Sequence, residues 1–221
     1  DDSDSAVSSA ENPALGALAI LALVDATGEI TVDELQAQGL RADKVNMGVN
    51  VSSKQASIAP ITAHLYDGSL KGFVQLRPIS GQLLLQSKQQ WQGIQLQPIM
   101  QVLTGEARVS GTVGGALEAH WQGSDINNLL TEIQADMNVR ATDGAVHGFN
   151  LAHSLRQASA KLKGSNTSGE DAPLQTDFAL IEGEGKLAKG IITSQNISAM
   201  LPLIRVKAKG STNLVTEQLD Y

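Results

Sequence analysis

The chain has 221 residues, of which 42% are hydrophobic, and this is enough for one large β-rich or α+β domain with a sizeable core. The net charge of −7 argues against nucleic-acid binding, which needs a basic surface that displaces counterions. The absence of cysteine excludes disulfides, zinc–thiolate sites and cysteine nucleophiles.

The N-terminal part of the chain predicts a tail followed by a helix. Residues 1–12 are acidic and rich in serine, which is typical of a disordered tail, and we expect residues 13–221 to form a single β-rich domain. Asn12 and Pro13 predict a helix start, and the apolar run 14–24 is about half the ~20 residues that a membrane-spanning helix needs. We therefore expect a buried helix that ends near residues 25–28, and any targeting or anchoring segment outside this sequence.

Alternation of apolar and polar residues then predicts strands. One strand contains residues 45–51, a long one runs from 107 to 122, another covers 133–141, and one near the end covers 204–208. The apolar supply is aliphatic, because only 3% of the residues are aromatic. Since apolar side chains fall on one side of each strand, we look for a binding surface before an active site.

Asp-Gly occurs twice between alternating residues and predicts two hairpins with two-residue turns. With a turn at Asp67-Gly68, Leu65 would face Leu70, Ala63 would face Gly72 and Ile61 would face Val74. With a turn at Asp143-Gly144, Ala141 would face Val146 and Val139 would face Gly148.

Helical spacing appears only in short pieces between strands. Ser124 is a candidate N-cap for a helix over 126–133, Asn150 for a helix with Leu151, Leu155, Ala158 and Leu162 on one face, and residues 98–103 form a third candidate. We expect core packing for Leu155, as for Leu18 and Leu21, and a polar loop over residues 164–173. The fold class predicted is mainly β with a few short α-helices (α+β).

Reactive constellations are missing from the sequence. The four histidines, His64, His120, His147 and His153, are scattered, and no hydrolase, metalloprotease or nucleotide-binding motif occurs. We expect no enzyme, no catalytic residue, no metal site and no cofactor. Trp121 falls on an apolar face, and we expect a buried core indole there.

Five segments together give the chain a resemblance to the C-terminal region of the AsmA family of bacterial envelope proteins. They are residues 28–35 (GEITVDEL) with 39–40, 65–72 (LYDGSLKG), 103–105 (LTG), 143–152 (DGAVHGFNLA) and 219–221 (LDY). The family is similar to TamB-like proteins and to the eukaryotic bridge-like lipid transfer proteins.

The resemblance implies a twisted, curled antiparallel sheet that forms an apolar groove. It implies a periplasmic domain, with the full-length protein anchored in the inner membrane, that holds phospholipid acyl chains and contributes to lipid transport between the inner and outer membranes and to outer-membrane assembly. Its partners would be phospholipid, the envelope membranes and envelope proteins. The alternating apolar positions that we expect to line the groove are Val45, Met47, Val49, Val51, Val109, Val113, Leu117, Met137, Val139, Ile204 and Val206.

Two other interpretations of the same alternation remain open. In the first, the chain is a scaffold or chaperone-like module whose sheet is fully packed and whose exposed edge strand pairs with a client during outer-membrane protein assembly. In the second, it is a spacer without a ligand.

Overall fold

A computed structural model describes residues 25–164, 173–214, 216 and 218–220. The predicted acidic tail, the helix start at Asn12 and Pro13 and the apolar run 14–24 lie outside these residues, as does most of the loop predicted over 164–173. Residues 26–28, where the first helix was expected to end, already belong to a strand. The mainly β fold class with short helices is confirmed.

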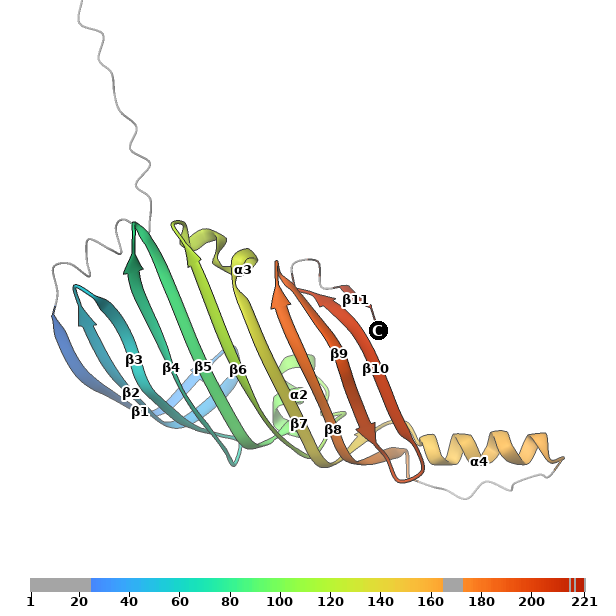
Figure 1. Cartoon of the computed structure of the whole chain (residues 1–221). Helices are drawn as coiled ribbons and strands as arrows, with labels where there is room; N and C mark the ends of the chain where they lie inside the picture. Colours follow the sequence, from blue (N-terminus) through green and yellow to red (C-terminus); the bar gives the residue numbers. More distant parts are fainter. Residues whose placement is uncertain (1–24, 165–172, 215, 217, 221) are drawn as a thin grey trace, which may run out of the picture.

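In the part of the chain that the structure describes, eleven strands form one antiparallel sheet, in which each strand pairs with the next one along the chain. The first and last strands do not pair with each other in the described part, so the sheet is open (Figure 1). The strands are β1 (Ala26–Ala37), β2 (Leu40–Ser52), β3 (Gln55–Leu65), β4 (Gly68–Ile79), β5 (Gln82–Gln95), β6 (Thr112–Gly123), β7 (Gln134–His147), β8 (Gln175–Ala188), β9 (Ile191–Met200), β10 (Arg205–Asn213) and β11 (Gln218–Asp220).

The helices sit in the longer connections between strands. They are α2 (Leu96–Thr104) after β5, a 3₁₀ turn η1 (Ile126–Asn128) followed by α3 (Leu129–Glu132) after β6, and α4 (Leu151–Leu162) after β7. The three predicted helix positions are thus confirmed. Asn150 caps α4 as predicted, by accepting a hydrogen bond from the His153 backbone N–H at 2.8 Å. The cap of the second helix is Asp125 and not Ser124, because the Asp125 carboxylate accepts from the Asn127 N–H.

Two-residue turns join most of the other strands. Residues 38–39, 66–67, 80–81 and 189–190 each place two successive residues at positive φ. Such turns have a twist that matches the right-handed twist of the flanking strands, which favours tight hairpins in a long meander.

The first predicted hairpin exists, but its turn lies one residue earlier than expected. Tyr66 and Asp67 form the turn, and Leu65 pairs with Gly68, Ala63 with Leu70 and Ile61 with Gly72. Gly68 is buried against β5, and a Cβ atom there would lie 2.5 Å from the Ile94 nitrogen. This glycine therefore serves close strand approach, and the apolar side chains keep the predicted face because the pairing moved by two residues.

The second predicted hairpin is wrong. β7 runs through Asp143 and Gly144 without turning, and Ala141 pairs with Ile181 of β8, not with Val146. The backbone oxygen of Ser110 and the ring of Phe178 occupy the space where a Cβ of Gly144 would lie. Here too the glycine permits a close approach, so an Asp-Gly pair marks no hairpin at this position.

The fully buried core is small and lies at one end of the sheet. Leu83 and Trp121 are each 1% exposed, and Leu76, Leu85, Leu129 and Ile133 pack against them. The expectation of a buried Trp121 is confirmed. Leu129 and Ile133 come from the α3 segment, so this short helix covers one end of one face of the sheet (Figure 1).

Candidate functional site

One face of the sheet carries aliphatic side chains from strand to strand. In an antiparallel pair, directly opposed residues project from the same face. Of the predicted residues on β2, Val45 lies opposite Val32, Met47 opposite Ile30, and Val51 opposite Ala26. The first two strands therefore begin the face with apolar neighbours.

The same face continues across β3 to β5. Met47 lies opposite Ile61 and Val49 opposite Ile58, with a register shift between these two pairs. From there Ile58 lies opposite Val74, and the face goes on through Leu76 and Leu85. It also carries two polar side chains of β5, because Ser87 lies opposite Val74 and Gln89 lies opposite Gly72.

The predicted residues of β6 and β7 lie side by side on this face. Leu117 is opposite Met137, Gly115 is opposite Val139, and Val113 is opposite Ala141. On the far strands the face passes through Gly183 and Ile197 to Ala208, and Val206 lies opposite Ala199. We call this surface the aliphatic face, and it comprises Ile30, Val32, Val45, Met47, Val49, Val51, Ile58, Ile61, Val74, Leu76, Leu85, Val113, Leu117, Met137, Val139, Ile197, Val206 and Ala208.

Most side chains of the aliphatic face are only half buried. Val45 is 4% exposed, but Val139 is 40%, Val206 42% and Ile30 47% exposed. Among the described residues, α3 covers the end around Trp121, and α2 has no buried residue. The middle of the face therefore lacks the second layer that would bury it in an ordinary sheet protein.

Trp121 ties the α3 segment to the end of the face. Its indole Nε1–H donates a hydrogen bond of 3.0 Å to Glu132 Oε2. Because the indole is buried, this bond satisfies a donor that water cannot reach. It fixes a short helix that would not be stable alone.

Two predicted lining residues lie outside the strands that build this face. Val109 precedes β6 and makes an isolated bridge to Val146, since Gly111 with φ of 113° interrupts the predicted long strand. Ile204 precedes β10 and lines a small hollow beside the first turn of α4. In both cases the alternation of apolar and polar residues in the sequence continues past the end of the strand. An odd or even position there no longer indicates which face the side chain is on.

The opposite face is polar and carries cross-strand ion pairs. Lys186 contacts Asp136 at 2.9 Å, Arg140 contacts Glu182 at 3.5 Å, and Lys88 pairs with Glu118. The hydrogen bond and the charge of Asp136 raise the pKa of Lys186. We call this the polar face, and its pairs lie in water, where they contribute little stability.

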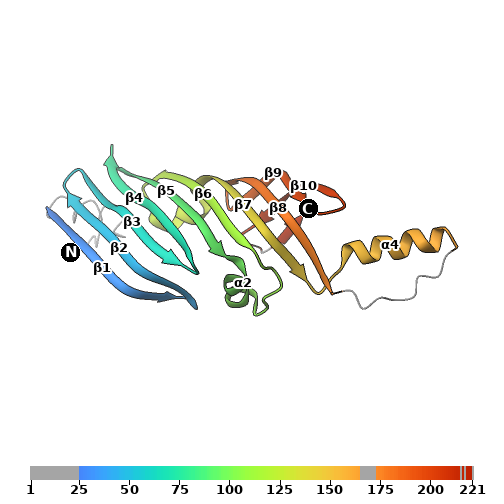
Figure 2. The same cartoon turned by 90° about the horizontal axis from the view of Figure 1, so that it is seen from below.

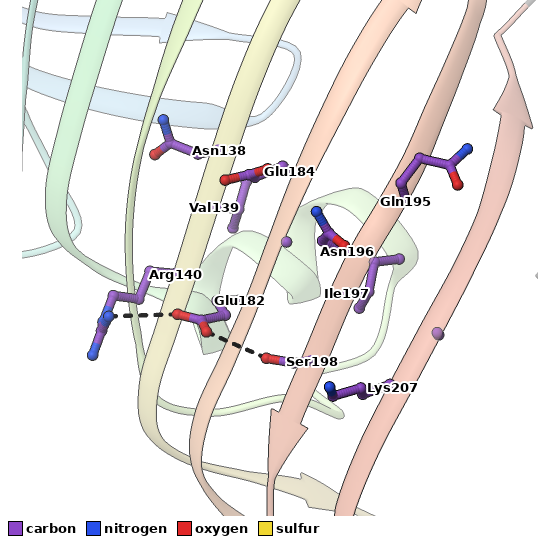
Figure 3. A pocket seen from close by; sticks show the side chains of 12 residues that line it. Asn138, Val139, Arg140, Glu182, Glu184, Gln195, Asn196, Ile197, Ser198 and Lys207 are labelled. Carbon is purple, nitrogen blue, oxygen red and sulfur yellow. Dashed lines mark hydrogen bonds and ion pairs between the residues drawn. The ribbon is translucent and has the colours of Figure 1, made fainter.

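A hollow of about 530 Å³ lies between β7 and β10. Figure 3 shows the side chains that line it, which are mostly polar but include Val139 and Ile197. The Glu182 carboxylate forms an ion pair with Arg140 and accepts a hydrogen bond of 3.3 Å from Ser198 Oγ. The helix behind the ribbon in Figure 3 has the colour of α2.

The titratable side chains do not converge. His147 bonds Ser110 Oγ at 3.1 Å, His153 bonds Gln157 at 2.8 Å, and His64 and His120 are exposed. Within residues 25–164 and 173–214 no group of three or more histidines and carboxylates could hold a metal ion. In the same part of the chain no helix has both the length and the apolar content to cross a bilayer.

Comparison with known proteins adds a family. Neither curated proteins nor solved structures gave a match. A sequence model described as "AsmA family" matches residues 12–197, which is most of the chain. Together with the mainly β architecture found above, this match shows that the chain belongs to the AsmA family.

Proposed function

We propose that the aliphatic face lines a groove that holds the acyl chains of phospholipid. In this proposal the chain is a periplasmic, non-enzymatic domain of a protein anchored in the inner membrane through a segment outside this sequence. It contributes to phospholipid transport between the inner and outer membranes and to outer-membrane assembly.

The observation that carries the proposal is the predominance of apolar pairs along one face. Apolar or glycine positions lie opposite one another on most strands from Ile30 on β1 to Ala208 on β10, and the polar side chains Ser87 and Gln89 of β5 interrupt them. A hydrocarbon chain needs contact area and no directed hydrogen bonds, so a mainly aliphatic strip suits it along most of its length.

Exposure on this face favours a mobile apolar occupant. A Val side chain gains about 1.5–3 kcal/mol on full burial. Val139 and Val206 are 40% and 42% exposed, so part of that gain is still to be made. An acyl chain laid over them would supply the missing apolar contact.

The curvature of the sheet favours the same occupant. In Figure 1 the lower ends of β1 and β2 bend away from the viewer, toward the side on which α2 lies. The aliphatic face carries α3 on that side, while the ion pairs of Figure 3 point the other way. A sheet bent in this sense would shelter acyl chains and keep its charged pairs in water.

Family membership supports the setting at a coarse level. Belonging to the AsmA family suggests a role in lipid transport or assembly at the cell envelope. The choice of phospholipid and of the periplasm is part of our proposal.

A second candidate function is the scaffold with an open sheet edge. β1 is exposed at all but one of its twelve residues and, within the described part of the chain, pairs only with β2. A long unpaired edge can accept a strand from a client. The acidic residues Glu29, Asp33 and Glu34 on β1 would discourage non-specific pairing and favour a client with basic residues.

Lipid occupancy separates the two candidates. Lipid is extracted from the purified chain with organic solvent, and the mass of the intact chain is measured by native mass spectrometry. The variants Val139→Asp and Asn138→Asp are treated in the same way. These two residues are neighbours on β7, and their side chains lie on opposite faces of the sheet. We expect phospholipid in the wild type and in Asn138→Asp, and a clear loss in Val139→Asp. A wild-type protein without lipid, or equal occupancy in the two variants, would replace the lipid proposal with the scaffold.

A further inference from the structure

Helix α4 projects from the sheet, beyond the ends of the last strands (Figures 1 and 2). It has twelve residues, so it is about 18 Å long, and none of its residues is buried. The expected core packing of Leu155 is wrong, because this side chain is 43% exposed. A helix this short gains no stability from packing along most of its length, so its exposed surface requires another explanation.

The base of α4 is held firmly by hydrogen bonds. Asn150 caps the helix and also donates from Nδ2 to the Pro173 carbonyl at 2.7 Å. The Leu151 N–H donates to Thr176 Oγ1 at 3.0 Å, which ties the first turn to β8. The direction of the helix relative to the sheet is thereby set at its start.

One stripe of α4 is apolar and uncovered. Leu151, Leu155, Ala158 and Leu162 follow at spacings of four, three and four residues, so they share one face. Leu162 is 90% exposed. In water, such a stripe on a projecting helix favours an apolar surface that covers it.

The charged side chains of α4 and its ends are all basic. Residues 150–164 contain Arg156, Lys161 and Lys163 and no Asp or Glu, although the whole chain has a net charge of −7. None of these three cations forms an ion pair with a described carboxylate. At 100° per residue, Arg156 and Lys163 lie on one flank of the leucine stripe and Lys161 on the other.

More apolar side chains surround the base of the helix. Phe149 is 50% exposed, Leu203 is 63% and Leu174 is 70% exposed. Leu203 lies in the turn before β10. Together with the first turn of α4 it borders a hollow of about 130 Å³, whose lining also includes the carboxylate of Asp177. Arg205 is two residues after Leu203 in the chain, so this end of the sheet combines several exposed apolar groups with further positive charge.

We infer that this end of the sheet docks on the surface of a bilayer that contains anionic phospholipid. A helix with an uncovered leucine stripe between basic flanks lies in the plane of the interface, with leucines among the acyl chains and cations among the phosphates. The absence of carboxylates from α4 favours an anionic surface over the mixed charges of an ordinary protein groove. The docked helix would hold the end of the sheet that bears β8 to β10 against the membrane.

The test is a vesicle flotation assay with the full chain. One set of vesicles contains phosphatidylglycerol and phosphatidylethanolamine, and the other contains only phosphatidylcholine. We expect flotation with the anionic vesicles and a loss of roughly tenfold in the bound fraction for Leu155→Gln/Leu162→Gln. Lys161→Glu should weaken binding at low salt and flatten its salt dependence, because one cation fewer is attracted to the anionic surface. The controls Leu35→Gln and Lys54→Glu, which change exposed residues elsewhere, should bind as the wild type does.

Several results would overturn the inference. The first is a wild-type chain that does not float with anionic vesicles, and the second is a leucine variant that floats normally. The third is a wild-type chain that sediments as a dimer while the leucine variant sediments as a monomer. Thermal melting checks that the variants remain folded. Lipid extracted from the leucine variant should match the wild type, so failure here is distinguishable from failure of the proposed groove.

Discussion

The indole ring of Trp91 on β5 lies over Gly115 on β6, and a Cβ atom at Gly115 would come within 2.6 Å of Trp91 Cζ2. The Asn138 carbonyl on β7 closes the same space from the other side. Glycine at this position therefore lets three strands and a large ring meet within the aliphatic face, where any side chain would separate them.

This relationship predicts the effect of Gly115→Ala. Overpacking of this kind costs roughly 1–3 kcal/mol, which corresponds to about 2–4 °C of melting temperature per kcal/mol for a chain of this size. Tryptophan fluorescence should also change, because the ring must move. The matched control is Gly28→Ala on β1, where a Cβ would meet nothing within 4 Å. Equal melting temperatures for Gly115→Ala and wild type would show that Trp91 does not pack as described.

Removing the partner of Trp121 should loosen the α3 segment. Glu132→Ala leaves a buried indole N–H without its acceptor, which costs about 1–3 kcal/mol. Glu132→Gln keeps an acceptor oxygen and should cost less. Chemical denaturation measures both. If Glu132→Ala and Glu132→Gln unfold at the same denaturant concentration as the wild type, the hydrogen bond does not hold the segment.

The extent of burial along the aliphatic face should decide what a carboxylate does there. Val45 is 4% exposed and Val139 is 40% exposed. Val45→Asp should destabilise the fold by several kcal/mol, because an unpaired charge is taken from water. Val139→Asp can stay hydrated and should shift the melting temperature little. Loss of folding in both variants would show that protein covers the whole face.

The turn between β3 and β4 offers a test of register. Gly68→Ala places a Cβ against the β5 backbone and should destabilise the fold, whereas Asp67→Gly relieves a residue held at φ of 69° and should leave stability unchanged or raise it by a few tenths of a kcal/mol. Thermal unfolding of the two variants checks this. The opposite order of stabilities would favour the turn at Asp67-Gly68.

These residues also show how far the sequence could lead. Period-two alternation placed Val45, Val113 and Val139 on one face correctly, because each lies within an unbroken stretch of strand. Val109 and Ile204 precede β6 and β10, and beyond a strand end alternation no longer fixes the direction of a side chain.

Glycine misled the sequence analysis for a physical reason. Gly68 and Gly144 both follow aspartate, and the sequence predicted positive φ for a turn at both. In the structure both glycines make room for atoms of other strands or loops, namely Ile94 in one case and Phe178 in the other. Those neighbours are 26 and 34 residues away in the chain, so local sequence could not reveal them.

The amphipathic character of α4 was visible in the sequence, but its exposure was not. The cap at Asn150 and the stripe through Leu155 were predicted. Whether such a stripe meets a core depends on where the helix points after β7, and this is set by bonds to Pro173 and Thr176 on the far side of the connection.

The most direct test of the lipid groove is site-specific photo-crosslinking in cells. It compares neighbouring residues whose side chains lie on opposite faces of the sheet. A photoreactive side chain is placed at Val49, Val113 or Val139 on the aliphatic face, and in separate variants at Asn50, Thr112 or Arg140 on the polar face. The groove predicts phospholipid adducts at the first three positions and none at the other three. Equal labelling of the two sets, or labelling of neither, would contradict it.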